Sequence, residues 1–391
     1  IKKIFGEFLM HNKISTKRGD EYFILMQGND ETVFSDSVYQ LFDKLHIVLS
    51  ELRLRLNDIL FIKFFLSDIA NQYSDLNKII NDMGIVAYTS FVGMPPSSGS
   101  KVAIEVHIIK SKNKTTVKHL TGGMVVKHND YATYYVDNSA YNSSNPDKQV
   151  KSLFESLNKY ALSNGMTVYD NLIRTWIYIR DIDNHYQNLV DGRYEYFFKN
   201  NLVPNTHYVS STGIEGVKEK ASCLFYMDSL FIKGLSTSQI DFLSAKEYIC
   251  PTHQYSTDRS YGNVGGNVTF ERGTKVTYGD RSHYYISGTA SIDKDGKIIH
   301  KKDVLLQAER AFENIKALLK SGGTNLGALA YIVVYLRDQS DYEAVDNYIK
   351  SKLHDTAYII VNGSVCNPSW LVEIDGFAAT SVGDNRFPDF F

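Results

Sequence analysis

The chain has 391 residues, two to three times the length of a typical domain, so we expect two or three folding units. Its 42 basic and 44 acidic residues are interspersed and leave a net charge of −2. This balance disfavours a nucleic-acid partner, which normally needs a basic surplus or stripe. Aromatic residues, mostly Tyr and Phe, make up 13% of the chain and favour strands with large, half-polar contact surfaces.

The cysteines and histidines indicate neither a metal site nor a disulfide framework. Cys223, Cys250 and Cys366 are odd in number and widely spaced, with no CxxC pair. The 11 histidines form no HxH or HExxH pattern, so we expect no metal and no cofactor. No apolar run approaches the roughly 18–20 residues that cross a bilayer, and the first residues lack a signal-peptide core. We therefore expect a cytoplasmic protein without a membrane partner.

One pattern recurs three times along the chain: an apolar strand that ends at an aspartate and leads into a polar segment. The three copies are Phe61–Tyr73, Thr175–Tyr186 and Tyr331–Tyr342. We take Asp68, Asp181 and Asp338 as their landmarks. A phenylalanine in a helical pattern lies 26, 27 and 26 residues before these landmarks, at Phe42, Phe154 and Phe312. Matching features at matching spacing predict an internal repeat.

The first copy begins with apolar positions of helical period around Leu41–Leu49, and Asp36 or Ser37 is the expected N-cap. Gly93 and Glu105 follow the landmark Asp68 by 25 and 37 residues. Gly363 and Asp375 have the same spacing in the third copy. This agreement extends the repeat through the strands that follow the landmark.

The second copy has its first helix around Leu153–Ala161. Ser144 or Asp147 is the expected N-cap, and Pro146 suits the first turn. The intervals from the landmark Asp181 to the next glycine and acid of the repeat are longer in this copy. These two residues are Gly213 and Asp228.

An additional stretch, Leu235–Asp280, separates the second and third copies and is rich in Gly, Ser and Tyr. It predicts a long ordered loop or an inserted hairpin that lies over a functional site. Its run Tyr261–Gly266 neither follows a strand nor opens a helix, which disfavours a phosphate-binding loop.

The third copy gives the clearest succession of elements. Strands are expected at Tyr284–Ile292, Leu329–Leu336, Ala357–Val361 and Leu371–Ala378, with helices at Lys302–Lys320 and Tyr342–Leu353. Gly322 and Gly323 end the first helix, and Asp338 or Ser340 is the expected cap of the second.

Each copy therefore predicts an α+β unit of order β–β–α–β–α–β–β, or a slight truncation of it. Two helices cover one face of such a sheet, and the other face, which the pattern makes apolar, must pack on something. Three units can do this by closing around a shared centre, as a monomeric pseudo-trimer. The expected boundaries are residues 1–115, 116–235 and 281–391 for the units and 236–280 for the insertion. Further self-association stays open.

Several motifs resemble those of a known superfamily. They are the run Tyr285–Ile292, Gln307, Asn314, Val334–Asp338, Leu371–Ile374 and, in the second copy, Leu172–Ile182 with Gly192-Arg193. Together they resemble RidA/YjgF proteins, which are also called endoribonuclease L-PSP. The SGTASI run, and Cys366 seven residues before Glu373, are more similar to the chorismatase branch, whose members release pyruvate from chorismate. The resemblance covers roughly residues 120–380 and implies three units of the chorismate-mutase-like (bacillus type) fold.

The sequence also departs from these families. The arginine that the imine-deaminating relatives carry in the penultimate strand is absent near Thr89, near Val209 and in Tyr358–Val361. Simple imine deamination is therefore disfavoured. The chorismatases carry an arginine in the last helix, and Glu343–Asp346 contains none, which leaves the choice of chorismate itself open.

Glu373 is the candidate catalytic acid, because only the third copy has a carboxylate two residues before its acidic landmark. Tyr226 and Ala103 occupy this place in the other copies. A carboxyl group on an apolar strand has its pKa raised by desolvation, which suits a proton donor. The alternative is an edge-strand Glu that faces solvent or forms a structural ion pair.

The candidate substrate-binding residues are Arg272, Arg337, Tyr285, Ser287, Gly288, Thr289 and Cys366. Arginine can hold a carboxylate through two hydrogen bonds. Arg337 has a structural alternative, since Arg180 occupies the same place in the second copy, and Arg174 and Arg193 are open in the same way. A strand bulge is the alternative for Ser287–Thr289, and a buried inert thiol is favoured for Cys366.

Three functions follow from these features. The favoured one is a chorismatase-like lyase or hydrolase that acts on a small carboxylated substrate in one cleft between units. A non-catalytic protein that binds a small carboxylate is the first alternative. Endoribonuclease activity of the L-PSP type is the second, and the charge balance disfavours it.

Overall fold

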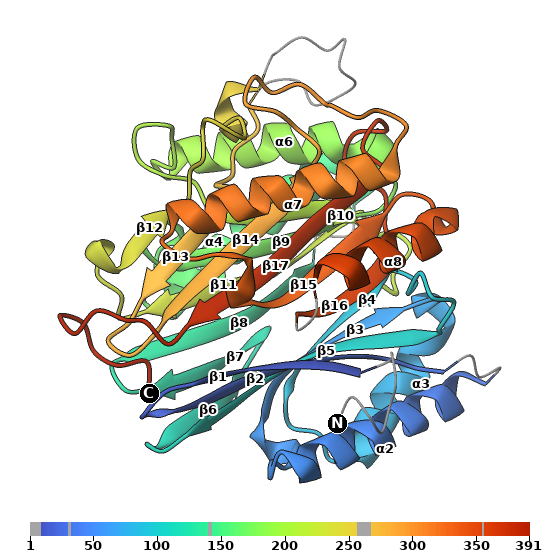
Figure 1. The fold of residues 1–391 in the computed structure, drawn as a ribbon, viewed down its shortest axis with the longest axis vertical. Coiled ribbons are helices and arrows are strands. Elements are labelled where there is room, and N and C mark those ends of the chain that lie inside the picture. The colour runs from blue at the N-terminus through green and yellow to red at the C-terminus, as the bar shows by residue number, and fades with distance from the viewer. Residues whose placement is uncertain (1–8, 30–32, 140–142, 256–266, 354–355) are drawn as a thin grey trace.

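The computed structural model describes residues 9–29, 33–139, 143–255, 267–353 and 356–391, which form three mixed sheets (Figure 1). The glycine-rich run Tyr261–Gly266 lies outside the described residues. Among the described residues no helix has the length and apolar character needed to cross a membrane.

The first sheet has the strand order β1-β2-β5-β3-β4. Its strands are β1 (Leu9–Ser15), β2 (Gly19–Gln27), β3 (Ile59–Leu66), β4 (Tyr88–Gly93) and β5 (Val102–Ser111). Helices α2 (Phe34–Glu51) and α3 (Ile69–Asp82) complete the unit. Helix α2 buries Leu41, Phe42 and Leu45, as the helical period predicts. Its N-cap prediction was wrong, because the helix starts at Phe34 and Asp36 and Ser37 lie in its first turn.

The second sheet has the order β10-β9-β11-β8-β7-β6. Its strands are β6 (Thr115–Leu120), β7 (Gly123–His128), β8 (Tyr131–Ser139), β9 (Leu172–Ile179), β10 (Ser210–Glu215) and β11 (Phe225–Lys233). Its helices are α4 (Pro146–Ser163), α5 (Val168–Asn171) and α6 (Ile182–Lys199). Pro146 is the first helical residue, as predicted, but Asn145 is the cap and accepts a hydrogen bond from the Lys148 amide. Ser144 and Asp147 flank this position and do not cap the helix.

The third sheet has the order β12-β13-β14-β17-β15-β16. Its strands are β12 (Ile240–Phe242), β13 (Gly273–Thr277), β14 (Ser282–Ala290), β15 (Leu329–Leu336), β16 (Ala357–Asn362) and β17 (Val372–Thr380). Its helices are α7 (Val304–Ser321) and α8 (Tyr342–Lys352). Gly322 ends α7 as expected. Asp338 caps a short 3-10 turn that leads into α8, and Asp341 is the N-cap residue of α8 itself.

The three units share one connectivity, which confirms the predicted repeat. In each, the third strand of the β–β–α–β–α–β–β order is parallel to the fourth (β3 with β4, β9 with β10, β15 with β16) and antiparallel to the last. Strands β6 and β12 add an outer strand to the second and third sheets.

The units close into a ring through three equivalent antiparallel bridges. The bridges join Gly93 to Val217, Ile214 to Val365 and Val361 to Pro96. Each starts at or near the penultimate strand of one unit and ends in the loop before the last strand of the next. Three heterologous contacts of one kind that return to the first unit are the geometry of a closed pseudo-threefold ring. In Figure 1 helices α2 and α3 lie below the sheets and α6 lies above them.

The inward faces of the sheets are more polar than the sequence predicted. They carry buried charged side chains, among them Lys63, Glu105, Arg174, Asp228 and Asp375. Two ion pairs join them across unit boundaries, Lys63 with Asp228 at 3.1 Å and Arg174 with Asp375 at 3.0 Å. Burial of these charges is tolerated because they are paired and hydrogen-bonded.

Candidate active site between the second and third units

A cleft lies where β10 of the second unit meets β14 and β17 of the third, and we call it cleft 2–3. Its lining consists of Tyr186, Ser211, Gly213, Tyr255, Phe270, Arg272, Gly288, Ala290, Ile292, Cys366, Trp370 and Glu373. It encloses about 420 Å³ of empty space, part of it open to solvent. Four of the residues predicted from the sequence meet here: Glu373, Arg272, Gly288 and Cys366.

Glu373 is the acid of the cleft. It lies on β17 with 6% of its surface exposed, so the solvent-facing alternative is wrong. Burial raises its pKa from 4.5 to about 8, the negative charge of Asp375 adds to the rise, and Arg272 and Arg174 oppose it. At neutral pH the carboxyl is therefore mostly protonated. A protonated carboxyl group beside a cavity is able to donate a proton to a bound molecule.

Gly288 allows this carboxyl to reach the cleft. A Cβ atom at position 288 would overlap the carboxyl group of Glu373, so any larger residue there would displace this carboxyl from its present position. The β14–β17 register shifts between Ile286 and Thr289, which makes this segment a strand bulge. The amide of Gly288 donates to Thr212 Oγ1 at 3.1 Å, which ties the bulge to the second unit. The strand bulge that the sequence left as an alternative is therefore also the segment that brings Gly288 to the cleft.

One arginine, Arg272, lines the cleft, and a second, Arg193, contacts the wall residues Ser211 and Phe270. Arg272 donates from Nε and Nη2 to the carbonyl oxygen of Cys250 at 3.1 and 2.8 Å, and from Nη2 to the hydroxyl of Tyr255. Arg193 on α6 is 2% exposed and donates only a long hydrogen bond, 3.4 Å, to Ser211. Its Nε and Nη2 have no hydrogen-bond partner among the described residues. Buried guanidinium nitrogens of this kind are able to bind a carboxylate that reaches them.

The remaining predicted residues have other roles in the structure. Tyr285 lies outside cleft 2–3 and lines a separate cavity at the centre of the ring. Arg337 forms an ion pair with Asp183 at 2.8 Å and donates to the carbonyl of Val365, which agrees with its structural alternative.

The hydroxyls of the bulge bind backbone. The Ser287 hydroxyl donates to the Glu271 carbonyl at 2.5 Å and accepts from the Ser211 amide at 2.9 Å. The Thr289 hydroxyl donates to the Ser287 carbonyl at 2.9 Å. These two side chains fix the bulge and leave its backbone, at Gly288, to line the cleft.

Cys366 lines the cleft as a protonated thiol. Burial and the nearby Glu373 raise its pKa far above the usual range. A thiol of this kind is a poor nucleophile, as the inert-thiol interpretation expected.

Sequence reasoning missed several lining residues. Tyr186 lines the cleft, and Arg193, which the sequence had left open, lies seven residues later on the same face of α6 because seven residues make two helical turns. That spacing is the signal that could have connected the two. Tyr255 belongs to the insertion Leu235–Asp280, which the sequence predicted to lie over a functional site. Trp370 comes from a loop, and nothing in its sequence context indicates this position.

Comparison with known proteins places this geometry in a family. The family model Endoribonuclease L-PSP matches residues 276–380. This segment is therefore similar to the L-PSP family, which is also called RidA/YjgF. The RidA/YjgF resemblance of the sequence is thereby confirmed for the unit that contributes Glu373 and Gly288 to the cleft.

Relatives and solved structures extend the comparison. The chain is 27% identical over 96 residues to 3-aminoacrylate deaminase RutC of Acinetobacter baylyi, which is 24% of this chain and 76% of that protein. It is 28% identical over 96 residues to a RutC family protein of Pyrococcus abyssi, with the same shares covered. The crystal structure of a chorismatase superposes on 82% of this chain and 93% of its own with a TM-score of 0.62 and 18% identity. At this identity the match demonstrates a shared fold: the RidA/YjgF fold in the chorismatase-like arrangement.

Proposed function

We propose that cleft 2–3 is the active site of a chorismatase-like lyase or hydrolase that acts on a small carboxylated substrate. The observation that carries the proposal is the protonated Glu373 in a cleft that is also lined by the guanidinium of Arg272. One group supplies a proton at neutral pH, and the other binds a carboxylate. The chorismatase fold and the restriction of this acid to the third unit both support the proposal.

The chemistry follows from the two groups. Arg193 and Arg272 hold the carboxylate of an enolpyruvyl ether, and Glu373 transfers its proton to the terminal CH2 carbon. The oxocarbenium ion that results adds water, the proton of that water returns to Glu373, and the ether C–O bond breaks. The products are an alcohol and pyruvate. Proton transfer by a positioned carboxyl group typically accelerates such a step by about 10²- to 10⁴-fold.

The size of the cleft adds a condition. The enclosed part of the cleft has a volume of only about 30 Å³, which is room for roughly two waters. A carboxylated ring is larger, so its entry requires the side chain of Tyr255 to turn away from Arg272. This movement would also free Arg272 Nη2, which now donates to the Tyr255 hydroxyl, for the substrate carboxylate.

The test is pyruvate release from chorismate by the wild-type chain and by Glu373→Gln. We expect turnover in the wild type and a loss of at least about 10²-fold in the variant. Glu105→Gln is the matched control, because it makes the same change at another buried glutamate of raised pKa that does not line the cleft. This control should keep turnover within a few-fold of wild type.

Two outcomes would contradict the proposal: no pyruvate from the wild type, or equal losses in the two variants. Chorismate that binds without pyruvate release would favour the non-catalytic alternative instead. Cleavage of RNA by stringently purified protein would favour the endoribonuclease alternative.

A further inference from the structure

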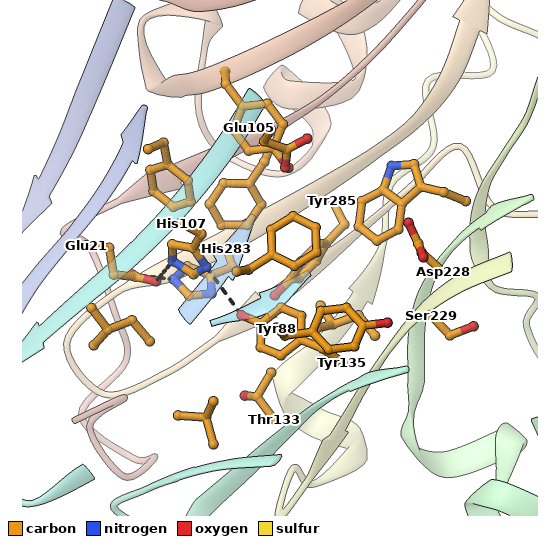
Figure 2. Close-up of a pocket in the computed structure, with 18 of the residues that line it drawn as sticks. Glu21, Tyr88, Glu105, His107, Thr133, Tyr135, Asp228, Ser229, His283 and Tyr285 are labelled. Carbon is orange, nitrogen blue, oxygen red and sulfur yellow. Dashed lines mark hydrogen bonds and ion pairs between the residues drawn. The ribbon is translucent and has the colours of Figure 1, made fainter. Parts of the chain in front are cut away.

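A second cavity lies at the centre of the ring, where the inward faces of the three sheets meet (Figure 2). It shares no lining residue with cleft 2–3. Aromatic rings from all three units form much of its wall, among them Phe61, Tyr88, Tyr135, Trp176, Tyr285 and Phe377. The enclosed part of the cavity has a volume of about 70 Å³, roughly half the ~150 Å³ of a cavity that binds benzene.

The acid at one side of this cavity is fully paired. Glu21 accepts hydrogen bonds from Arg281 at 2.7 Å, from His283 at 2.8 Å and from His107 at 3.3 Å. These positive partners hold the pKa of Glu21 well below its usual range in spite of its burial. Tyr135 binds the other ring nitrogen of His107 at 3.3 Å.

Asp228 lies across the cavity from Glu21 and His107 in Figure 2. Its Oδ2 accepts from Ser90 at 2.6 Å and pairs with Lys63 at 3.1 Å. Burial raises the pKa of the third acid, Glu105, which favours its neutral form. The charges of the cavity therefore balance among themselves. A further charge would enter an aromatic, water-poor space without a counter-ion, so the cavity favours a neutral ligand.

Three polar atoms of lining residues have no partner among the described residues. They are Oδ1 of Asp228, the hydroxyl oxygen of Tyr88 and Oγ of Ser229. Asp228 is 4% exposed and Tyr88 is 8% exposed. Burial keeps the pKa of Tyr88 well above its usual range, so its hydroxyl stays protonated. A buried carboxylate oxygen without a donor costs free energy, and a ligand hydroxyl would satisfy it.

We propose that the central cavity binds a neutral, monocyclic aromatic compound that carries a hydroxyl group. The ring packs among the aromatic side chains in offset or edge-to-face contact, and the hydroxyl bonds with Asp228 Oδ1 and Tyr88. Phenol is the simplest member of the class, and its entry requires the aromatic side chains of the wall to move apart. The site is independent of the reaction proposed for cleft 2–3.

Isothermal titration of the full chain with phenol, benzene and benzoate tests the proposal. We expect the wild type to bind phenol most tightly, benzene more weakly because it lacks the hydroxyl, and benzoate least because of its charge. Tyr88→Phe should weaken phenol binding about five- to tenfold and leave benzene binding unchanged. This variant removes only an unpartnered oxygen, so we expect it to fold normally.

Two further variants locate the binding site. Val126→Phe adds a ring from the wall of the cavity and should abolish binding of both phenol and benzene. Glu373→Gln changes only the other cleft and should leave phenol binding within twofold of wild type, so that failure of the two proposals can be told apart. Absence of phenol binding to the wild type, as for a cavity that holds only water, would overturn the proposal. Phenol binding that is unchanged in Tyr88→Phe or in Val126→Phe would overturn it as well.

Discussion

Two boundaries of the ring, between units 1 and 2 and between units 2 and 3, have the same backbone and different contents. At the first, Lys218 follows the bridge residue Val217, forms an ion pair with Asp137 at 2.9 Å and lies 4.8 Å from the ring centre of Tyr226. At the second, Cys366 follows the bridge residue Val365. The long side chains of Lys218 and Tyr226 occupy the first boundary.

The corresponding positions at the second boundary are small or uncharged. Tyr226 is replaced by Glu373, two residues before Asp375, and Asp137, opposite Asp228, is replaced by the bulge at Gly288. Cleft 2–3 is therefore open because smaller groups take the places of the long side chains that occupy the boundary between units 1 and 2. One glycine and one short thiol make the room in which a single carboxyl group can act.

The largest expected difference between the two boundaries is in the pH dependence of stability. Glu373 has a pKa of 4.5 when unfolded and about 8 in the fold, so the folded state holds its proton more tightly. The contribution of Glu373 to the free energy of unfolding is complete below pH 4.5, falls as the pH rises and is lost above about pH 8. The wild type should therefore lose on the order of 5 kcal/mol more than Glu373→Gln across this range. Urea unfolding of both proteins from pH 4.5 to 9 measures the difference, and parallel curves would refute the assigned pKa.

Breaking the Lys218–Asp137 ion pair, at the boundary between units 1 and 2, should have a smaller effect on stability. Lys218→Met leaves the carboxylate of Asp137 without its partner, and we expect a loss of about 2 kcal/mol. The value is below that of a fully buried pair because Asp137 keeps 28% of its side-chain surface exposed. The double variant Lys218→Met/Asp137→Asn should recover more than half of the loss in urea unfolding at pH 7. Turnover of chorismate should not change. A large loss of turnover would mean that the boundary between units 1 and 2 is coupled to cleft 2–3.

The smallest effect is expected at the outer edge of the second boundary. Arg337 and Asp183 join units 2 and 3, but their side chains are 18% and 43% exposed, so water and salt weaken the pair. Arg337→Ala should reduce the free energy of unfolding by less than about 1 kcal/mol. A matched loss in Asp183→Ala and in the double variant would confirm a single weak pair. A large rise in KM for Arg337→Ala would instead return this residue to the substrate site.

The sequence was sufficient for the architecture because the repeat is local. Helical periods such as Leu41–Leu49, and the fixed spacing from Asp68 to Gly93, depend on residues close together in the chain. Helix caps were less predictable, since several neighbouring residues can serve and Asn145 does so in place of Ser144.

The inward charges could not be predicted, because their partners lie far apart in sequence. Arg174 and Asp375 are 201 positions apart and belong to different units. Glu373 was found because comparison of the copies isolates it. Tyr285 precedes the bulge and lines the central cavity, whereas Gly288 within the bulge lines cleft 2–3. The register shift between Ile286 and Thr289 is a feature of the folded sheet that the sequence does not reveal.

The three bridges also have a consequence for assembly. Because Gly93–Val217, Ile214–Val365 and Val361–Pro96 all join parts of one polypeptide, each unit meets its neighbours at an effective concentration set by its linkers, in the millimolar range for short ones. Dilution cannot separate the units, so the melting temperature should not depend on protein concentration as that of a separable trimer does. One chain also lets each boundary change by itself, whereas a substitution in a trimer of identical subunits alters all three at once.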